Sequence, residues 1–314
     1  MYQVVLHPEQ PPGVRDALEA MVDVEVIAPA DADGVHAALD SGVPILATFR
    51  WDDRFLTPSL RWIAGEGAGF EQYPLEELDA AGVALTTATG VHSVSVAEHA
   101  MGLLLSLTRR IGESTRDAVD HVWQERPGTE LHGKTLAVLG LGTIGEEIAR
   151  LAQAFGMDVI GLKRDPANYH GRVSEVFGPD QLLEVCRRAD VLVVILPGGD
   201  ETRHLIDDEV LRELGPGWLV SVGRGPVIDE QALVAALTAG NLQGAGLDVF
   251  ETEPLPDSSK LWEIPNVVLT PHIGGSTPRY GERWAEIFRR NLLALEGEGP
   301  WINRVVDGAR LHES

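Results

Sequence analysis

Short runs of apolar, often β-branched residues recur along this 314-residue chain, and segments with helical periodicity separate them. A strand that is apolar on both faces has to be covered on both faces, as happens when helices cross over between parallel strands. The sequence therefore predicts an α/β fold built on parallel sheets. The runs form two series, the first at 4–6, 24–27, 45–48 and 83–86, the second at 135–139, 159–162, 191–196, 218–222, 245–249 and 267–270.

A long helical pattern separates the two series. Residues 96–110 are strongly apolar, and residues 111–121 continue the pattern with more polar side chains. A chain of this length is also too long for one compact core. We therefore expect two doubly wound domains, with long helices crossing between them. One helix in the second domain shows its ends clearly: Asp229 can cap it, Leu233, Ala236 and Leu237 form its buried stripe, and Gly240 ends it.

The strand at 135–139 runs directly into the glycine pattern Gly140-x-Gly142-x-x-Gly145, and a helix follows with Ile148, Leu151, Ala152 and Phe155 on its apolar face. Gly140 permits the tight turn, Gly142 lets the backbone approach a pyrophosphate, and Gly145 lets the helix pack closely on the strand. The phosphates would bind the free N–H groups at the positive helix end, where Thr143 and Ile144 begin the first turn. This context predicts dinucleotide binding.

Three further motifs stand at or near the ends of predicted strands, where open α/β sheets bind ligands. Arg224 lies between two glycines, Glu251 and Glu253 follow Asp248, and His272 stands in a Thr-Pro-His-Ile-Gly context. An isolated arginine in a turn is usually a surface residue. The residues themselves do not decide between the carboxylates of Glu251 and Glu253.

With these motifs, the chain resembles the D-isomer-specific 2-hydroxyacid dehydrogenase family over essentially its whole length. Gly67-Ala68-Gly69, the Val-Ala-Glu-His-Ala sequence at 96–100, the glycine fingerprint and the Arg, Glu and His motifs appear in the family's order. The resemblance implies a Rossmann-type dinucleotide-binding domain, residues 93–278, inserted into a flavodoxin-like substrate-binding domain, residues 1–92 and 279–314.

The resemblance also implies a reaction, the transfer of hydride between a nicotinamide cofactor and a small 2-keto acid or D-2-hydroxy acid. The catalytic residues would be Arg224, which grips the substrate carboxylate, His272, the proton donor, and Glu253, which orients the imidazole. Backbone groups of Ala68 and Gly69 would hold the substrate. Asp248 would bind the nicotinamide amide. Other expected cofactor contacts are Leu196, Pro197, Thr202, Val222, Gly223, Arg224, His272 and Gly274.

Other interpretations remain open at this point. A dinucleotide-sensing, corepressor-like scaffold and a formate- or phosphite-type dehydrogenase would use the same fold. Ser221 replaces an asparagine usual in the family, and two glycines at 198–199 replace a commoner Leu-Thr pair. Arg50, Trp51, Tyr280 and Trp284 are candidates for the substrate side-chain pocket, and each could equally be a packing residue.

The choice of cofactor depends on the residues that follow the second strand of the dinucleotide domain. NAD-preferring relatives place an aspartate there, which binds the ribose hydroxyls and repels a 2′-phosphate. This strand ends instead in Lys163-Arg164. We therefore expect NADP(H), with NAD(H) as the alternative if Asp165 turns in to bind the ribose.

Composition limits the partners. The formal charge of −23 disfavours nucleic acids and anionic membrane surfaces. Cys186 is the single cysteine, and the first residues lack a signal-peptide pattern, so we expect a cytoplasmic protein. The histidine and glutamate spacing does not suggest a metal site. The apolar residues 96–107 and the arm to Trp123 predict a homodimer, unless both segments are buried within one chain.

Overall fold

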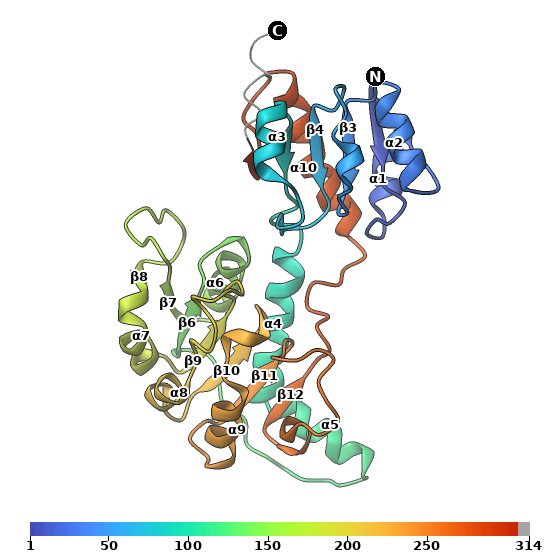
Figure 1. Ribbon diagram of the computed structural model, residues 1–314. Coiled ribbons are helices and arrows are strands. Elements are labelled where there is room, and N and C mark those ends of the chain that lie inside the picture. Colours follow the sequence, from blue (N-terminus) through green and yellow to red (C-terminus); the bar gives the residue numbers. More distant parts are fainter. Residues whose placement is uncertain (307–314) are drawn as a thin grey trace. The chain divides into compact units, whose positions relative to one another are not determined.

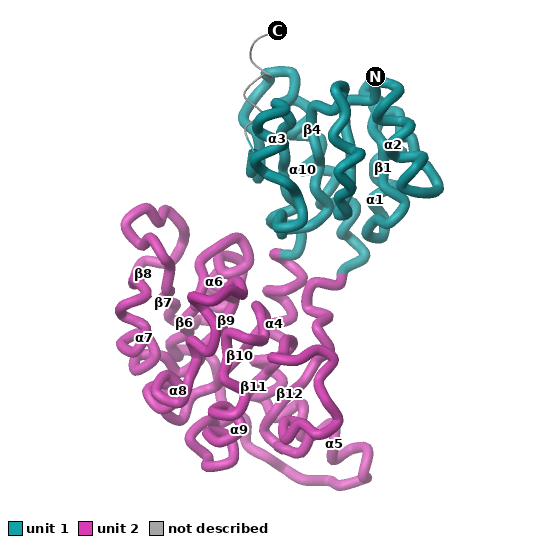
Figure 2. Tube along the Cα trace, viewed as in Figure 1, with its two compact units in different colours: residues 1–92, 277–314 teal, residues 93–276 magenta. Residues whose placement is uncertain are grey.

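The computed structural model describes residues 1–306, and residues 307–314, the last part of the expected substrate-binding domain, lie outside the described residues. The chain forms two compact units (Figure 2). Unit 1 consists of residues 1–92 and the chain from Thr277 onward, and unit 2 of Ser93–Ser276. The chain therefore returns from unit 2 to unit 1 after Ser276, whereas the sequence predicted this return after residue 278. Within residues 1–306, no helix combines the length and hydropathy needed to cross a bilayer.

Unit 1 contains a six-stranded sheet in the order β2-β1-β3-β4-β5-β13 (Figure 1). All pairs are parallel except β13 with β5. This is the flavodoxin-like strand order with one antiparallel edge strand added. The strands are β1 (Tyr2–Leu6), β2 (Val24–Ile27), β3 (Ile45–Thr48), β4 (Trp62–Gly65), β5 (Ala84–Thr86) and β13 (Arg304–Val306).

Helices cover both faces of this sheet. α1 (Val14–Glu19) and α10 (Tyr280–Leu295) pack on one face, and α2 (Ala32–Asp40) and α3 (Leu75–Ala81) pack on the other, where the short η1 (Asp53–Phe55) also lies. An aromatic stack fixes α10, since Phe288 lies 4.8 Å from Trp62 and 5.1 Å from Trp284, ring centre to ring centre.

Unit 2 contains a seven-stranded, fully parallel sheet in the order β8-β7-β6-β9-β10-β11-β12. The order reverses between β6 and β9, which is the crevice where Rossmann-type domains bind dinucleotides. The expected fold class is confirmed. The strands are β6 (Thr135–Leu139), β7 (Asp158–Leu162), β8 (Glu175–Phe177), β9 (Val191–Val194), β10 (Trp218–Ser221), β11 (Gly244–Leu247) and β12 (Val267–Leu269).

Two layers of helices cover this second sheet. α4 (Ser93–Thr108) and α6 (Thr143–Ala154) bury one face, and α7 (Leu182–Arg188), α8 (Asp208–Leu214) and α9 (Glu230–Thr238) bury the other. The short helical turns are η2 (Pro179–Gln181), η3 (Gly225–Val227) and η4 (Lys260–Glu263). α9 has the predicted cap, as the Asp229 carboxylate accepts the Ala232 N–H at 3.0 Å. One helical prediction is wrong: Phe155 follows the end of α6 and is 42% exposed.

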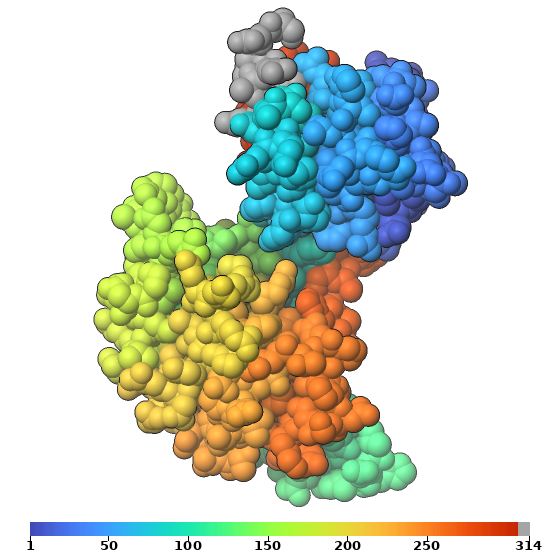
Figure 3. Space-filling view, viewed as in Figure 1, coloured from blue at the N-terminus to red at the C-terminus, as the bar shows by residue number. Residues whose placement is uncertain are grey.

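The apolar helix α4 does not leave a free hydrophobic face. Its apolar residues pack against α6 and the sheet inside unit 2. The surface we expected from residues 96–107 is therefore buried within one chain. α5 (Ile111–Val119) has no buried residue, and it lies with the following segment at the surface of unit 2, pale green in Figure 3. Val119 is 77% exposed and Trp123 is 93% exposed.

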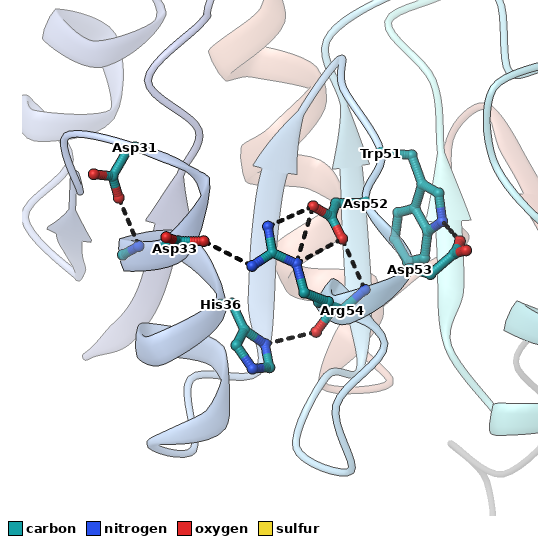
Figure 4. Close-up of polar contacts among 8 residues, drawn as sticks. Asp31, Asp33, His36, Trp51, Asp52, Asp53 and Arg54 are labelled. Carbon is teal, nitrogen blue, oxygen red and sulfur yellow. Dashed lines mark hydrogen bonds and ion pairs between the residues drawn. The ribbon is translucent and has the colours of Figure 1, made fainter.

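Carboxylates on the surface of unit 1 are paired locally (Figure 4). The Arg54 guanidinium bonds Asp52 and Asp33, each at 2.7 Å, and the His36 ring lies 2.7 Å from the Arg54 carbonyl oxygen. Hydrogen bonds from Arg54 lower the pKa of Asp52 to about 2. Among residues 1–306, no group of three or more His, Cys, Asp or Glu side chains is arranged to hold a metal ion. This acidic cluster is consistent with a surface ion-pair network.

Glu66, which directly follows β4, is a buried exception. The residue is 2% exposed, and neither carboxylate oxygen has a hydrogen-bond partner among the described residues. Burial raises the pKa of this carboxyl to about 8. Because the folded protein then binds the proton more tightly than the unfolded chain, Glu66 disfavours folding increasingly as pH rises from about 4.5 to about 8, by about 1.4 kcal/mol per pH unit.

Glu66→Gln removes this titration while keeping the side chain's shape. We expect the variant to gain stability over the native chain between pH 5 and pH 8, with a constant difference above that window. Urea unfolding of both proteins at several pH values measures the difference. A difference that is independent of pH would contradict a neutral, buried Glu66.

Candidate active site

The three expected catalytic residues follow three adjacent strands. Arg224 comes after β10, Glu253 after β11 and His272 after β12, and these strands are neighbours in the parallel sheet. Parallel pairing places their carboxyl ends at one edge. Gly225 brings two of the loops into contact, because a Cβ at this position would overlap the Phe250 peptide.

His272 and Glu253 form a hydrogen-bonded pair. Nδ1 of the imidazole lies 2.6 Å from Glu253 Oε2, and the other carboxylate oxygen accepts the Phe250 N–H at 3.0 Å. A carboxylate at Nδ1 favours a proton on that nitrogen, so Nε2 is left to exchange a proton with a ligand. The His272 side chain is 48% exposed, which makes such an exchange possible sterically.

Glu251 serves a different structural purpose. Its carboxylate accepts the Glu230 N–H at 2.9 Å and lies 3.0 Å from His204 Nε2. The Glu251 N–H in turn donates to the Glu230 carboxylate at 2.6 Å. Glu251 therefore ties its loop to the start of α9, and the structure pairs His272 with Glu253.

Arg224 is exposed and available to an anion. Its guanidinium donates to the neighbouring Gly223 carbonyl at 3.0 Å, and it makes no ion pair with any carboxylate within residues 1–306. In a chain with 48 acidic residues, such an arginine at the binding edge of the sheet fits the recognition of a carboxylate.

Asp248 is buried beneath the segment that carries His272. It is 2% exposed, and its carboxylate accepts hydrogen bonds from the Thr270 hydroxyl at 2.6 Å, the Ile273 N–H at 3.0 Å and the Gly274 N–H at 2.9 Å. The resemblance implied a contact between Asp248 and nicotinamide. In the structure both carboxylate oxygens hold residues 270–274, and the contact with nicotinamide stays a prediction.

The glycine loop after β6 has the geometry that a pyrophosphate requires. Gly140 has a φ of +111°, and a Cβ on Gly145 would overlap the Gly140 carbonyl oxygen. Gly142 precedes α6 and has open space where a side chain would stand. The first-turn amides, including those of Thr143 and Ile144, have no acceptor within the helix. These residues therefore fit a dinucleotide at the end of β6.

The two cations after β7 behave differently from each other. The Lys163 ammonium donates to the Leu141 carbonyl at 2.8 Å, inside the glycine loop, and lies 5.9 Å from the centre of the Tyr169 ring. Arg164 is largely exposed and pairs with the equally exposed Glu201 at 3.2 Å. Asp165 bonds the Asn168 side chain at 2.7 Å. Of the two cations, Arg164 is therefore the freer to meet a ligand.

The remaining expected cofactor positions lie on loops at the same edge of the unit 2 sheet. The Thr202 hydroxyl donates to the Pro197 carbonyl at 2.8 Å, and Gly223 packs against the Leu196 backbone. Val222 is buried and follows β10, and Gly274 packs against Asp248. Ala68 and Gly69 lie in unit 1, in the turn after β4, and Ala68 is exposed.

The proposed side-chain pocket is partly corrected. Tyr280 and Trp284 are 6% and 2% exposed, and the Trp284 indole donates to the Gly65 carbonyl at 3.0 Å. Both residues therefore belong to the core of unit 1. A cavity of about 510 Å³ lies beside His272 and Glu253 in unit 2, and its apolar wall is formed by Phe250, Leu255, Trp262 and Leu269.

Two residues near the site, His99 and Thr270, lie within motifs quoted from the sequence, but the sequence assigned a role in the site to neither. His99 Nε2, from α4, lies 2.8 Å from the Thr270 hydroxyl and 3.2 Å from the Asp248 carboxylate. His99 and Thr270 are separated by 171 residues in sequence, and no local pattern joins them.

Comparison with known proteins places these observations in a family. Residues 101–274 match the model of the NAD-binding domain of D-isomer-specific 2-hydroxyacid dehydrogenases. The chain is 35% identical to glyoxylate/hydroxypyruvate reductase B of Serratia proteamaculans over 308 residues, which cover 93% of each protein. It is 36% identical to D-3-phosphoglycerate dehydrogenase of Mycobacterium tuberculosis over 299 residues, 91% of this chain, but spans only 56% of that relative's length.

Among solved structures, the fold matches an NADPH-dependent glyoxylate/hydroxypyruvate reductase of Sinorhizobium meliloti, crystallised with citrate, with a TM-score of 0.74 and 30% identity. The match covers 98% of this chain and 99% of that one. The family match includes the glycine loop, Arg224, Glu253 and His272. The chain therefore belongs to the D-isomer-specific 2-hydroxyacid dehydrogenase family.

Proposed function

We propose that this protein reduces a small 2-keto acid to the D-2-hydroxy acid with a nicotinamide cofactor. The observation that carries the proposal is the His272–Glu253 pair. Its residues follow β12 and β11, beside β10, which Arg224 follows, and Arg224 makes no ion pair within residues 1–306. Similarity to reductases of glyoxylate and hydroxypyruvate supports a small, anionic substrate.

The chemistry assigns a role to each side chain. The reduced nicotinamide supplies the hydride when it is bound. Arg224 presents a planar fork of N–H donors, which can bind the substrate carboxylate and polarise the adjacent carbonyl. His272 holds a proton at Nε2 for the oxygen that gains negative charge. Glu253 stabilises the imidazolium and fixes the ring, and the backbone of Ala68 and Gly69 would hold the substrate.

Substitutions at the three positions test this assignment. Arg224→Lys retains the charge but loses the fork, so we expect a severe loss of kcat/KM for keto acid reduction. His272→Ala should lower kcat by about 10² to 10⁴, the usual contribution of a proton donor. Glu253→Gln should also impair turnover, whereas Glu251→Gln should have a much smaller effect because Glu251 faces α9.

Arg212→Lys, an exposed substitution on α8, is the matched control for Arg224→Lys. Steady-state kinetics with a panel of 2-keto acids, formate and phosphite would measure these effects. Turnover of formate or phosphite alone would favour the other dehydrogenase chemistry on this fold. Dinucleotide binding with no turnover of any of these compounds would favour a sensing scaffold.

We propose NADP(H) as the preferred cofactor, with Arg164 as the residue that meets the 2′-phosphate. No acidic residue stands directly after β7 to bind both ribose hydroxyls, and the exposed Arg164–Glu201 pair is of a weak type that can exchange partners. Lys163 supports the site differently, by bonding the glycine loop at Leu141. The NADPH-dependent relative from Sinorhizobium meliloti agrees with this choice.

Arg164→Ser should raise the KM for NADPH by about tenfold or more and leave the KM for NADH nearly unchanged, because one charge-assisted contact is lost. Adding Lys163→Asp should favour NADH further by restoring an acidic residue after β7. Arg188→Ser, at an exposed pair near β8, is the matched control. A native preference for NADH would refute the proposal.

We propose that the protein forms homodimers through α5 and the arm that follows it. Ile111, Val119 and Trp123 leave an apolar surface that unit 2 does not cover. Light scattering at micromolar concentration should give twice the chain mass of 33.9 kDa. Trp123→Asp together with Val119→Asp should shift the mass toward the monomer, and an unchanged dimer would place the interface elsewhere.

The buried, single Cys186 is compatible with the proposed cytoplasmic location.

A further inference from the structure

We propose that His99 is a positioning residue for the reaction, which acts through Asp248 and Thr270 to hold the segment that carries His272. The inference rests on the proposed role of His272 as proton donor. His99 lies on α4, and its side chain is only 21% exposed. All four residues belong to unit 2.

The contacts determine where the proton lies on His99. The Thr270 hydroxyl is 2.6 Å from Asp248 Oδ1 and 2.8 Å from His99 Nε2. The hydroxyl has one proton, and the buried carboxylate is the stronger acceptor for it. His99 Nε2 must therefore be protonated and donate to the hydroxyl oxygen. The same nitrogen lies 3.2 Å from Asp248 Oδ1, so its N–H faces both acceptors.

The segment after β12 needs this support because its backbone is unusual. His272 has a φ of +51°, in the left-handed region that residues other than glycine seldom adopt. Such conformations persist where the surroundings fix them. The Asp248 carboxylate bonds Thr270, Ile273 and Gly274, and its backbone carbonyl accepts the His272 N–H at 2.9 Å. Hydrogen bonds to Asp248 therefore bracket the catalytic histidine on both sides.

Helix α4 contacts the same segment at further points. A Cβ on Gly274 would lie 3.2 Å from the His99 ring and 2.9 Å from the Asp248 carboxylate, so this position is closely packed. Ser95, one turn before His99 on the same helical face, has its hydroxyl 3.4 Å from the Gly275 carbonyl oxygen. α4 thus forms a rigid support along residues 270–275, and His99 is its polar contact with the buried carboxylate.

Loss of the His99 N–H would leave the Thr270 hydroxyl and the buried Asp248 carboxylate short of a donor. A buried charge that loses a partner is costly, and we expect the segment to shift in response. Misplacement of a reacting group by about 1 Å can lower the rate by about 10²-fold. Because His99 acts on His272 and not on the ligands, the loss should appear in kcat more than in KM.

The experiment compares His99→Leu, which removes the donor, with His99→Gln, whose amide can place an N–H at a similar distance. The exposed neighbour variant Glu98→Gln is the matched control. We expect His99→Leu to lower kcat by about 10- to 100-fold, with the KM for the keto acid and the Kd for the reduced cofactor changed less than about threefold. His99→Gln should recover most of this loss.

A double variant separates positioning from a general structural role. In an His272→Ala background, His99→Leu should lower kcat by less than about twofold, because the residue through which it acts is already absent. Thr270→Val removes the hydroxyl link without touching His99, and it serves if His99→Leu does not fold. Thr270→Val should lower kcat by the same factor as His99→Leu. Adding His99→Gln to Thr270→Val should lower kcat no further.

The inference is overturned by an unchanged kcat in both His99→Leu and Thr270→Val. An equal loss from His99→Leu with and without His272, or a Gln variant no better than Leu, also overturns it. These outcomes are distinct from failure of the proposed function, which would appear as native kcat in the single variant His272→Ala.

Discussion

Parallel pairing of β10, β11 and β12 is the constraint on which the candidate active site depends. Each strand enters the sheet from the same side, so each following loop leaves at the same edge. Arg224, Glu253 and His272 are separated by up to 48 residues in sequence and still follow neighbouring strands. A flanking glycine then lets these loops approach closely, since the Gly225 backbone lies against Phe250. The strand order brings these three residues to one edge of the sheet, and the loops orient their side chains.

The two most buried carboxylates show how differently this protein treats negative charge. The Asp248 carboxylate accepts hydrogen bonds from two backbone amides and a hydroxyl, and the His99 imidazole lies 3.2 Å away. These donors stabilise its negative charge inside the protein. Glu66 is as deeply buried and has no such donors among the described residues, and its pKa is raised accordingly. The first carboxylate fixes residues 270–274, the segment that carries His272. The second is neutral over most of the physiological pH range and stands beside the turn that contains Ala68 and Gly69.

The sequence predicted the elements that have strong local signals. Apolar runs and helix stops placed most strands and α9 correctly, because a strand buried on both faces requires a continuous apolar stretch. It missed β4, whose glycine end weakens the pattern, and the short edge strands β8 and β13, most of whose residues are not fully buried. Phe155 was assigned to a buried face because helical periodicity alone does not show that α6 ends one residue earlier.

Within the site, residue types were predictable and contacts between distant segments were not. The family resemblance pointed to His272 and Glu253, but the residues themselves did not decide between Glu251 and Glu253. The structure pairs Glu253 with His272 and turns Glu251 toward α9, because two residues along a loop can face opposite elements. Lys163 illustrates the same limit. Its position after β7 suggested a phosphate contact, whereas its ammonium bonds the Leu141 carbonyl across two strands. A lysine held this way braces the glycine loop, whereas the exposed Arg164 beside it makes a surface ion pair with Glu201. Adjacent cations can thus be held by very different contacts, which their positions in the sequence do not reveal.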